Sequence, residues 1–207
     1  LEGKLGFDGH WTHQTRTPKI AVDQQGVQLT VAASKGEFIG TGTGTGIAGN
    51  GSAFAWSMPS IRMSYKNNTV ELTGLSAAGV IDDMQLGLGK QTIGIDRIDV
   101  SGNVPGGAAL MSGMRFDYET VADDGRVSTS FAPSVELVRA AGNTFQDLMF
   151  KVQLGGLDEQ ALREINRVSR HQCQTRMDDE QVARIERAIL RIIDQGVSLS
   201  VTDISGR

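Results

Sequence analysis

The strongest constraint on the fold of this chain is an alternation of apolar and polar residues with a period of two, which dominates residues 1–154. Segments 27–31 and 61–65, for example, place apolar residues at odd positions and polar residues between them. Successive side chains of a β-strand point to opposite faces, so this pattern predicts strands with one buried face. The 26 glycines, against 4 prolines, suit twisted strands joined by tight turns.

Two short segments predict hairpin turns between these strands. Residues 66–68 read Lys-Asn-Asn, and Asn tolerates a positive φ. Asp124 and Gly125 form one of the strongest signals for a two-residue turn.

One predicted strand, at residues 93–100, changes phase. Ile93 and Ile95 occupy odd positions, whereas Ile98 and Val100 occupy even ones. A strictly alternating strand would send the two pairs to opposite faces, so the pattern predicts a β-bulge near residues 96–97. A functional site at Asp96 and Arg97 is the less favoured interpretation.

The spacing becomes helical after residue 154. Asp158 is a predicted N-cap, and Leu162, Ile165 and Val168 follow on one helix face. These positions predict a first amphipathic helix.

A second helix is predicted from Asp178, where Gln181 completes a capping box and Met177 can contact Val182 as a hydrophobic staple. Gly196 is the expected C-terminal glycine, and a strand is predicted after it. The apolar stripe of this helix comprises Val182, Ile185, Ile189, Ile192 and Ile193.

These elements predict a single α+β domain over residues 1–207. We expect a large, curved, mainly antiparallel β-sheet from residues 1–154, two amphipathic helices from 155–196 packed on one face, and a returning strand at 197–204. On this arrangement Ile185, Ile189 and Ile192 should be buried against the sheet.

The Gly/Thr run at residues 40–46 is the most unusual local feature. Gly44-x-Gly46-x-x-Gly49 matches the dinucleotide-binding fingerprint, but that motif requires a helix to follow. Residues 52–56 predict a strand instead. We therefore favour a Gly/Thr edge strand or hairpin, with its glycines on one face where a bulky group could lie.

A second glycine motif, at residues 87–92, resembles a phosphate-binding loop only faintly. The first glycine of such a loop would fall on Met84, and Gln91 stands where Ser or Thr is needed. Phosphate binding is not predicted there.

The histidines and the single cysteine do not predict a catalytic or metal site. His10 and His13 are three residues apart in a strand, so their side chains should point to opposite faces. His171 and Cys173 could form a thiol–imidazole pair, but no acidic residue is placed to orient the histidine. A cysteine in a polar loop is the favoured interpretation.

Neighbouring acidic residues are equally uninformative. The pairs at 82–83, 123–124 and 178–179 fall at predicted turns or a helix start, where Asp is expected. Trp11 and Trp56 are predicted core residues rather than a sugar platform. The sequence thus predicts no catalytic residue, cofactor site or metal site.

Charge and hydropathy narrow the choice of partners. The net charge is −4, with 20 basic and 24 acidic residues spread along the chain, so nucleic acid is an unexpected partner. No segment approaches the ~18 apolar residues needed to span a membrane. The chain begins at Leu1 without a signal peptide, and both ends look cut, so we expect a piece of a longer protein.

The order of elements in the last third of the chain resembles the YdgA-like family of bacterial cell-envelope proteins. Residues 148–162 run from a strand through a short turn into a helix that opens Leu-Asp-x-x-Ala-Leu, and a second amphipathic helix and a strand follow. The resemblance is specific only around residues 145–204. It implies an N-terminal membrane anchor outside these residues, a β-rich region on the periplasmic side of the inner membrane, and no catalytic motif.

Two functions follow as expectations. The favoured one is a non-catalytic periplasmic module that binds a protein partner or an apolar, lipid-like ligand through the face of its sheet. The alternative is an envelope hydrolase whose catalytic residues lie outside residues 1–207.

The geometry of the predicted sheet supports the favoured function. Ten strands at ~4.8 Å spacing would be wider than two helices can cover. Part of the apolar face would then be closed by the curling sheet itself, by other parts of the protein, by a second copy, or by lipid.

Overall fold

A computed structural model of the chain describes residues 2–5, 10–41, 51–83, 85–103, 107–170 and 178–207. Strands account for 70% of these residues and helices for 15%. The predicted α+β class with a large antiparallel sheet is therefore confirmed, and the sheet does not close on itself.

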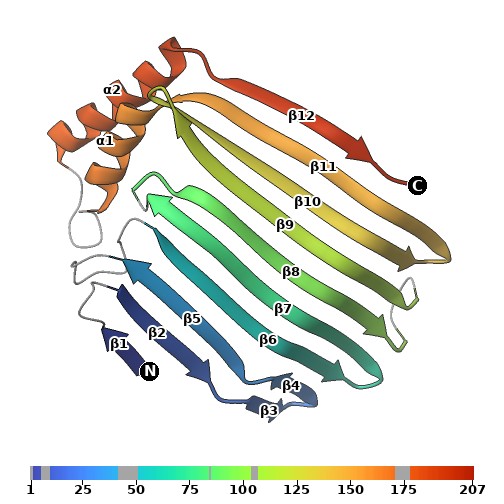
Figure 1. Cartoon of the computed structure of the whole chain (residues 1–207). Helices are drawn as coiled ribbons and strands as arrows, with labels where there is room; N and C mark the ends of the chain where they lie inside the picture. Colours follow the sequence, from blue (N-terminus) through green and yellow to red (C-terminus); the bar gives the residue numbers. More distant parts are fainter. Residues whose placement is uncertain (1, 6–9, 42–50, 84, 104–106, 171–177) are drawn as a thin grey trace.

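One twelve-stranded sheet contains all the strands (Figure 1). Hydrogen bonding joins the strands in the order β1-β2-β5-β6-β7-β8-β9-β10-β11-β12, while β4 pairs with both β3 and β6. The strands are β1 (Glu2–Leu5), β2 (His10–Thr17), β3 (Ile20–Gln24), β4 (Val27–Val31), β5 (Ser34–Thr41), β6 (Ser52–Tyr65), β7 (Asn68–Asp83), β8 (Leu88–Ser101), β9 (Ala109–Asp123), β10 (Arg126–Ala140), β11 (Asn143–Asp158) and β12 (Ser198–Ser205).

Tight hairpins connect most neighbours, as the turn residues predict. Lys66 has a φ of 54° between β6 and β7, and Asp124 and Gly125 have φ of 46° and 72° between β9 and β10. Ala141 and Gly142 make a similar turn between β10 and β11, with φ of 49° and 79°. The last two turns have a positive φ at both central residues, as a type I′ turn requires. In the turn after β6 the positive φ falls on Lys66 and not on the asparagines from which the turn was predicted.

The predicted β-bulge at residues 96–97 is wrong. Thr73 pairs with Arg97 and Leu75 pairs with Ile95, so Asp96 lies opposite Gly74 with no extra residue in either strand. On the other side of β8, Asp96 lies opposite Gly113 of β9 in the same way, between the pairs Ile95–Met114 and Arg97–Ser112. The irregularity is therefore shared by neighbouring strands.

A line of such residues, which we call the crease, crosses the sheet. In each strand, or in the link between two short strands, one residue belongs to this line. The residue pairs before and after it show that it lies opposite the corresponding residue of the neighbouring strand. The crease comprises Pro18, Ala33, Pro59, Gly74, Asp96, Gly113, Glu136 and Asp147. Gly74, Gly113 and Asp147 have φ of 64°, 61° and 54°, respectively, so alternate strands take a left-handed residue there.

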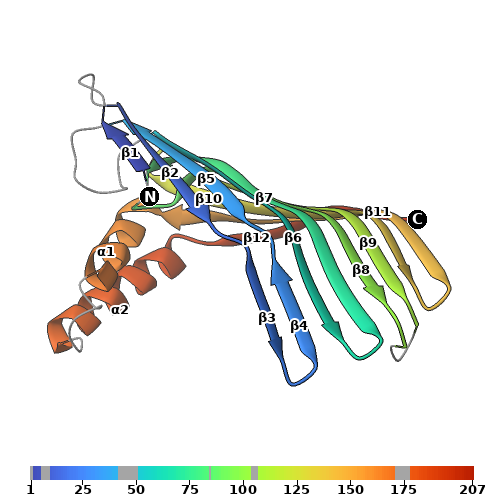
Figure 2. The same cartoon turned by 90° about the horizontal axis from the view of Figure 1, so that it is seen from below.

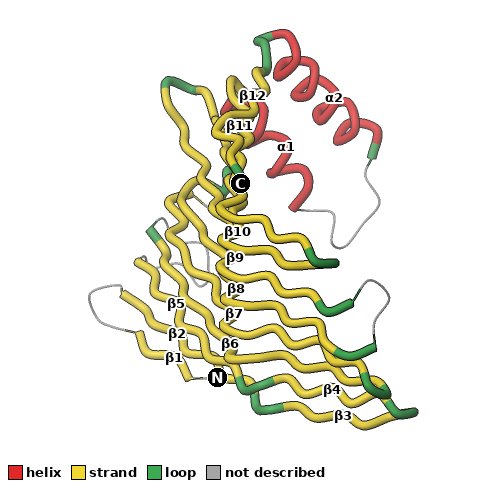
Figure 3. The backbone as a smooth tube through the Cα atoms, turned by 90° about the vertical axis from the view of Figure 1, so that its right-hand side faces the viewer, coloured by secondary structure: helices red, strands yellow, loops and turns green. Residues whose placement is uncertain are grey.

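The apolar phase changes at the crease in the neighbouring strands as well as in β8. In β9, for example, the apolar residues on one side of the crease are Met114 and Phe116, at even positions. On the other side the apolar residue is Met111, at an odd position. A left-handed residue within a strand, such as Gly113 in β9, reorients the side chain that follows it, as in a bulge. The apolar residues of each strand therefore stay on one face, and the sheet bends at the crease (Figures 2 and 3).

Helices α1 (Glu159–Arg170) and α2 (Asp179–Asp194) lie together near one end of β9–β11 (Figure 1). Asp158 caps α1, because its Oδ1 accepts the Ala161 N–H at 2.7 Å. The predicted capping box of α2 is present, with Asp178 bonded to the Gln181 N–H at 2.8 Å. Gly196 follows α2 with a φ of 83°, as expected, whereas Met177 lies outside the described residues.

The predicted burial of the α2 stripe against the sheet is wrong. Ile189 is 44% exposed, and Ile185 and Ile192 are only half-buried. The helices pack on each other and on β11 instead of lying across the sheet. The buried positions among the described helix residues are Ala161 and Val168 of α1 and Ala188 of α2, and two of these three are small.

Candidate functional site

The most unusual feature of the molecule is the apolar face of its sheet. Antiparallel pairing places Phe38 opposite Phe54 and Ile93 opposite Phe116. Rings on neighbouring strands stack with centroids 6.2 Å apart, both for Phe38 with Phe54 and for Phe116 with Phe131. Cross-strand aromatic pairs of this kind stabilise a sheet by burying ring surface against its neighbours.

This face is open along much of its length. Ile93 is 52% exposed, Phe131 is 40% exposed and Phe150 is 43% exposed. On the other side of the crease, Met63 and Phe145 are 45% and 49% exposed. Large apolar side chains normally leave water when a chain folds, so a row of half-exposed ones marks a surface that something else can cover.

The opposite face of the sheet carries the charged pairs, together with single exposed apolar side chains at Ile39, Val80, Val121 and Met149. Lys90 pairs with Glu119 at 2.9 Å, and Arg115 pairs with Asp117 at 2.7 Å. A hydrogen bond from Arg115 lowers the pKa of Asp117, and one from the Thr92 hydroxyl lowers it further. Partial burial raises the pKa but does not offset these hydrogen bonds. The ion pairs suit this face to water, and its apolar side chains are scattered among them, whereas the aromatic rings gather on the other face.

The helices lie at one end of the apolar face, beside β11. Thr120 and Val127, which continue the apolar side of β9 and β10, are 3% and 2% exposed and are among the most buried residues described. In Figure 2 the helices and the part of the sheet beyond the crease project to the same side of the remaining sheet. The apolar face is therefore the inner surface of a concave shape.

A cavity of about 500 Å³ opens on this face near β2, β5, β6 and β7. Its lining is mostly apolar and includes Trp11, Phe38, Phe54, Trp56, Ala77 and Ile81. The sequence predicted Trp11 and Trp56 to be core residues. Both are instead half-buried residues in the wall of an open cavity.

Glycines make room for the aromatic rings of this cavity. A Cβ on Gly40 would lie 2.3 Å from the Trp11 ring, and a Cβ on Gly79 would lie 2.9 Å from the Phe54 ring. Both distances are shorter than van der Waals contact, so a side chain there would displace the ring. The expectation that a bulky group lies across the glycine face is confirmed at Gly40, and the group is Trp11.

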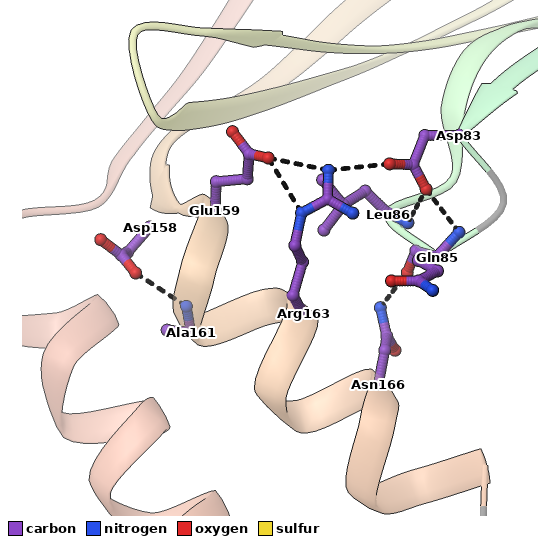
Figure 4. A network of polar contacts seen from close by, with 8 residues as sticks. All are labelled: Asp83, Gln85, Leu86, Asp158, Glu159, Ala161, Arg163 and Asn166. Carbon is purple, nitrogen blue, oxygen red and sulfur yellow. Dashed lines mark hydrogen bonds and ion pairs between the residues drawn. The ribbon is translucent and has the colours of Figure 1, made fainter. Parts of the chain in front are cut away.

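An ion-pair network holds α1 to the β7–β8 turn (Figure 4). The Arg163 guanidinium bonds to Asp83 and to Glu159, each at 2.8 Å. Asp83 also accepts the backbone N–H groups of Gln85 and Leu86 at 2.7 and 3.2 Å. Burial raises the pKa of Asp83, but these hydrogen bonds outweigh it and hold the pKa below its ordinary value.

Two further contacts fix the helices. The Asn166 amide donates to the Gln85 carbonyl, and Arg191 of α2 pairs with the buried Asp158 at 3.1 Å. The network of charged side chains is therefore explained by attachment of the helices, and its geometry does not place a nucleophile beside a base.

The other candidate residues fall in structural positions or outside the described ranges. His13 lies on β2 opposite Phe38, and His10 begins the same strand. Leu88 begins a strand directly after Gly87, so the helix that a phosphate-binding loop needs is not there. Residues 42–50, which contain Gly44, Gly46 and Gly49, lie outside the described part, as do His171 and Cys173; strand β6 does begin at Ser52 as predicted.

Within the described residues, no group of three or more His, Cys, Asp or Glu side chains could hold a metal ion. Neither α1 nor α2 is long and apolar enough to cross a membrane.

The comparisons with known proteins identify a family but no function. Residues 1–207 match the family described as "Bacterial protein of unknown function (DUF945)", and because the match spans the chain, the chain belongs to this family. Searches of curated proteins and of solved structures give no match.

Proposed function

We propose that this member of a bacterial family of unknown function is a non-catalytic module that binds an apolar, lipid-like ligand on the concave face of its sheet. The observation that carries the proposal is the open apolar face, which holds the stacked aromatic rings and the apolar cavity and continues across the crease. An apolar ligand would remove this surface from water, at about 25 cal/mol for each Å² that is buried.

The chemistry of the face favours a chain-like ligand over one rich in polar groups. Small-molecule sites are typically concave, mostly apolar and ~300–1,000 Å³ in volume, and the cavity beside Trp11 and Trp56 lies within that range. Most of its lining offers dispersion contacts without fixed hydrogen-bond partners. Such a surface tolerates different positions of an acyl chain along the strands.

The test uses palmitic acid as the probe and two matched variants of the 207-residue chain. Ile93→Asp places a carboxylate on the apolar face at a position that is 52% exposed. Val80→Asp places the same charge on the neighbouring strand but on the opposite face, at a position that is 46% exposed. Both changes should be tolerated by the fold, because both side chains already contact water.

We expect Ile93→Asp to weaken palmitate binding by about tenfold or more, which corresponds to ~1.4 kcal/mol, and Val80→Asp to leave it unchanged. Equilibrium titration, with native mass spectrometry of freshly purified protein to detect copurified lipid, measures both. A chain that binds no acyl ligand, or one that both variants weaken equally, would contradict the proposal. If Ile93→Asp instead abolishes capture of a protein by an otherwise ligand-free chain, the face serves a protein partner.

The proposed location is the periplasmic side of the bacterial inner membrane. Its support is the similarity of residues 145–204 to the YdgA-like pattern of strand, two helices and strand. Protease treatment of spheroplasts would test it, since a periplasmic module is digested without lysis of the inner membrane. Protection of the module until lysis would contradict this location.

A further inference from the structure

Strand β12 forms an open edge of the sheet. It has one described partner, β11, and no described strand pairs with its outer side. All eight of its residues are exposed, including Leu199 at 70%, Val201 at 54% and Ile204 at 77%. An edge of this kind presents unpaired N–H and C=O groups to any extended chain.

The first five residues of β12 lack the usual protection against pairing. Residues 198–202 read Ser-Leu-Ser-Val-Thr and contain no charge and no proline. Natural edge strands are commonly blocked by Lys, by proline or by a bulge. Here the irregularity comes only later, at Asp203, which has a φ of 55°.

We propose that β12 pairs antiparallel with β12 of a second copy of the chain, about a two-fold axis at Ser200. This register is self-complementary. Leu199 of one copy lies opposite Val201 of the other on the apolar side, and Ser198 lies opposite Thr202 on the polar side. A second copy fits better than an unrelated strand because the sequence Ser-Leu-Ser-Val-Thr matches its own reverse in apolar and polar character.

The same register extends the contact beyond the strands. Ile204 of one copy would lie near Val197 of the other, which precedes β12 and is 43% exposed. Ile193, at the end of α2, is 63% exposed and is four residues before Val197. Pairing would thus cover the most exposed apolar side chain of β12 together with Val197.

Among the described residues, the opposite side of the sheet offers no equivalent edge. Strand β1 has only four residues, and the outer strand β3 carries Asp23 within its five residues. A short or charged edge pairs weakly. The difference between the two edges predicts a closed two-fold dimer rather than an open chain of sheets.

The test exploits the axis at Ser200, because this residue would face its own copy. Cα atoms of directly opposite residues are ~4.5–5.5 Å apart, so Ser200→Lys or Ser200→Glu would bring like charges together. Each variant alone should weaken dimerisation about tenfold or more, and an equimolar mixture of the two should restore it as a heterodimer. Sedimentation velocity over a concentration series measures all three samples.

Gln153→Lys is the matched control. Gln153 pairs with Ser200 on β11 and is exposed on the same face. In the dimer the two copies of residue 153 would be three strand spacings apart, or ~14 Å, which exceeds the screening length of ~8 Å at physiological salt. This variant should therefore dimerise like the unaltered chain.

A second measurement does not depend on charge. In a chain with Cys173→Ser, Ser200→Cys should form an intermolecular disulfide under mild oxidation, since opposite Cα atoms lie within disulfide range, and Gln153→Cys should not. A monomer at all concentrations overturns the proposal, as does a mixture of Lys and Glu variants that stays monomeric. Neither outcome bears on palmitate binding, so the proposed function stands or falls separately.

Discussion

At the scale of single residues, the crease depends on glycines that carry a positive φ in crowded surroundings. Gly74 and Gly113 have φ of 64° and 61°. A Cβ on Gly113 would lie 2.3 Å from Cδ of Glu136, and one on Gly74 would lie 1.9 Å from Oδ2 of Asp96. The acidic side chains of the next strands therefore occupy the space that a side chain on these glycines would need.

We predict that Gly113→Ala destabilises the fold more than a glycine replacement in an open turn. Gly125 has a φ of 72° but no atom within 4 Å of its virtual Cβ, so Gly125→Ala should cost ~1 kcal/mol from backbone strain alone. Gly113→Ala must in addition displace the Glu136 side chain, which is exposed and can swing aside, for a total of about 1–2 kcal/mol. Urea denaturation of both variants measures the difference, and equal costs would show that the crease is not crowded.

The sequence pattern located the crease in β8 but wrongly predicted a β-bulge there. The phase break between Ile95 and Ile98 correctly marked the position of Asp96. A single sequence pattern does not show that neighbouring strands change phase at the same level, because that depends on register. A bulge is the expected explanation for one strand, whereas the register shows that Gly74 and Gly113 take part as well.

At the scale of elements, the helix pair is held by small residues and ion pairs rather than by its isoleucine stripe. Caps were predictable because they are local: Asp158 and Asp178 act where the sequence placed them. The surface on which α2 packs was not predictable, because an amphipathic stripe shows only that a helix has an apolar side. Ile189 is 44% exposed in this chain, while Ala188 is buried.

We predict opposite outcomes for these two neighbours. Ala188→Leu should destabilise the chain by ~1–3 kcal/mol, because the added volume must enter the contact between α1 and α2. Ile189→Ala should cost less than ~1 kcal/mol, since the side chain is 44% exposed. Thermal denaturation tests both, and a larger loss for Ile189→Ala would mean that the stripe is covered in solution.

Attachment of α1 through Asp83 should depend on pH. The folded-state pKa of Asp83 lies below its ordinary value of 3.8, so the ionised carboxylate stabilises the folded state. This contribution is complete above pH ~5 and is lost as the pH falls through 3.8 towards the folded-state pKa. Asp83→Asn should therefore cost about 1 kcal/mol at neutral pH and progressively less in acid.

Urea denaturation across a pH series measures this effect, with Asp82→Asn as the control. Asp82 is the exposed neighbour of Asp83 on the same strand. A cost of Asp83→Asn that does not change between neutral and acid pH would contradict the role of the carboxylate charge.

At the scale of the whole molecule, the chain is an open sheet with little interior. Met58 and Val127 are the only large apolar strand residues, among those described, that are buried, and Met58 is still 9% exposed. Strand content and the antiparallel class followed from alternation, but the concave shape did not. Concavity arises from the crease and from helices placed at one end, and both are products of register and docking rather than of local pattern.

This architecture predicts a gradient of stability across the sheet. Backbone amides of β8 and β9 are flanked by long strands on both sides, whereas β12 and β3 are edges. Hydrogen exchange should be slowest in β8 and β9 and fastest at the edges. Uniform protection across all strands would contradict an open sheet, and selective protection of β12 that rises with protein concentration would fit pairing of copies.

The crease also limits how the sequence can change in length. Each strand contributes one residue to it. The apolar residues on the two sides of the crease lie on the same face only if that residue is present. Deletion of Asp96 alone would turn one half of β8 inside out while β7 and β9 kept their pattern. Insertions and deletions in this family should therefore gather in the hairpin turns, and a length change at the crease should be tolerated only where neighbouring strands gain or lose a residue together.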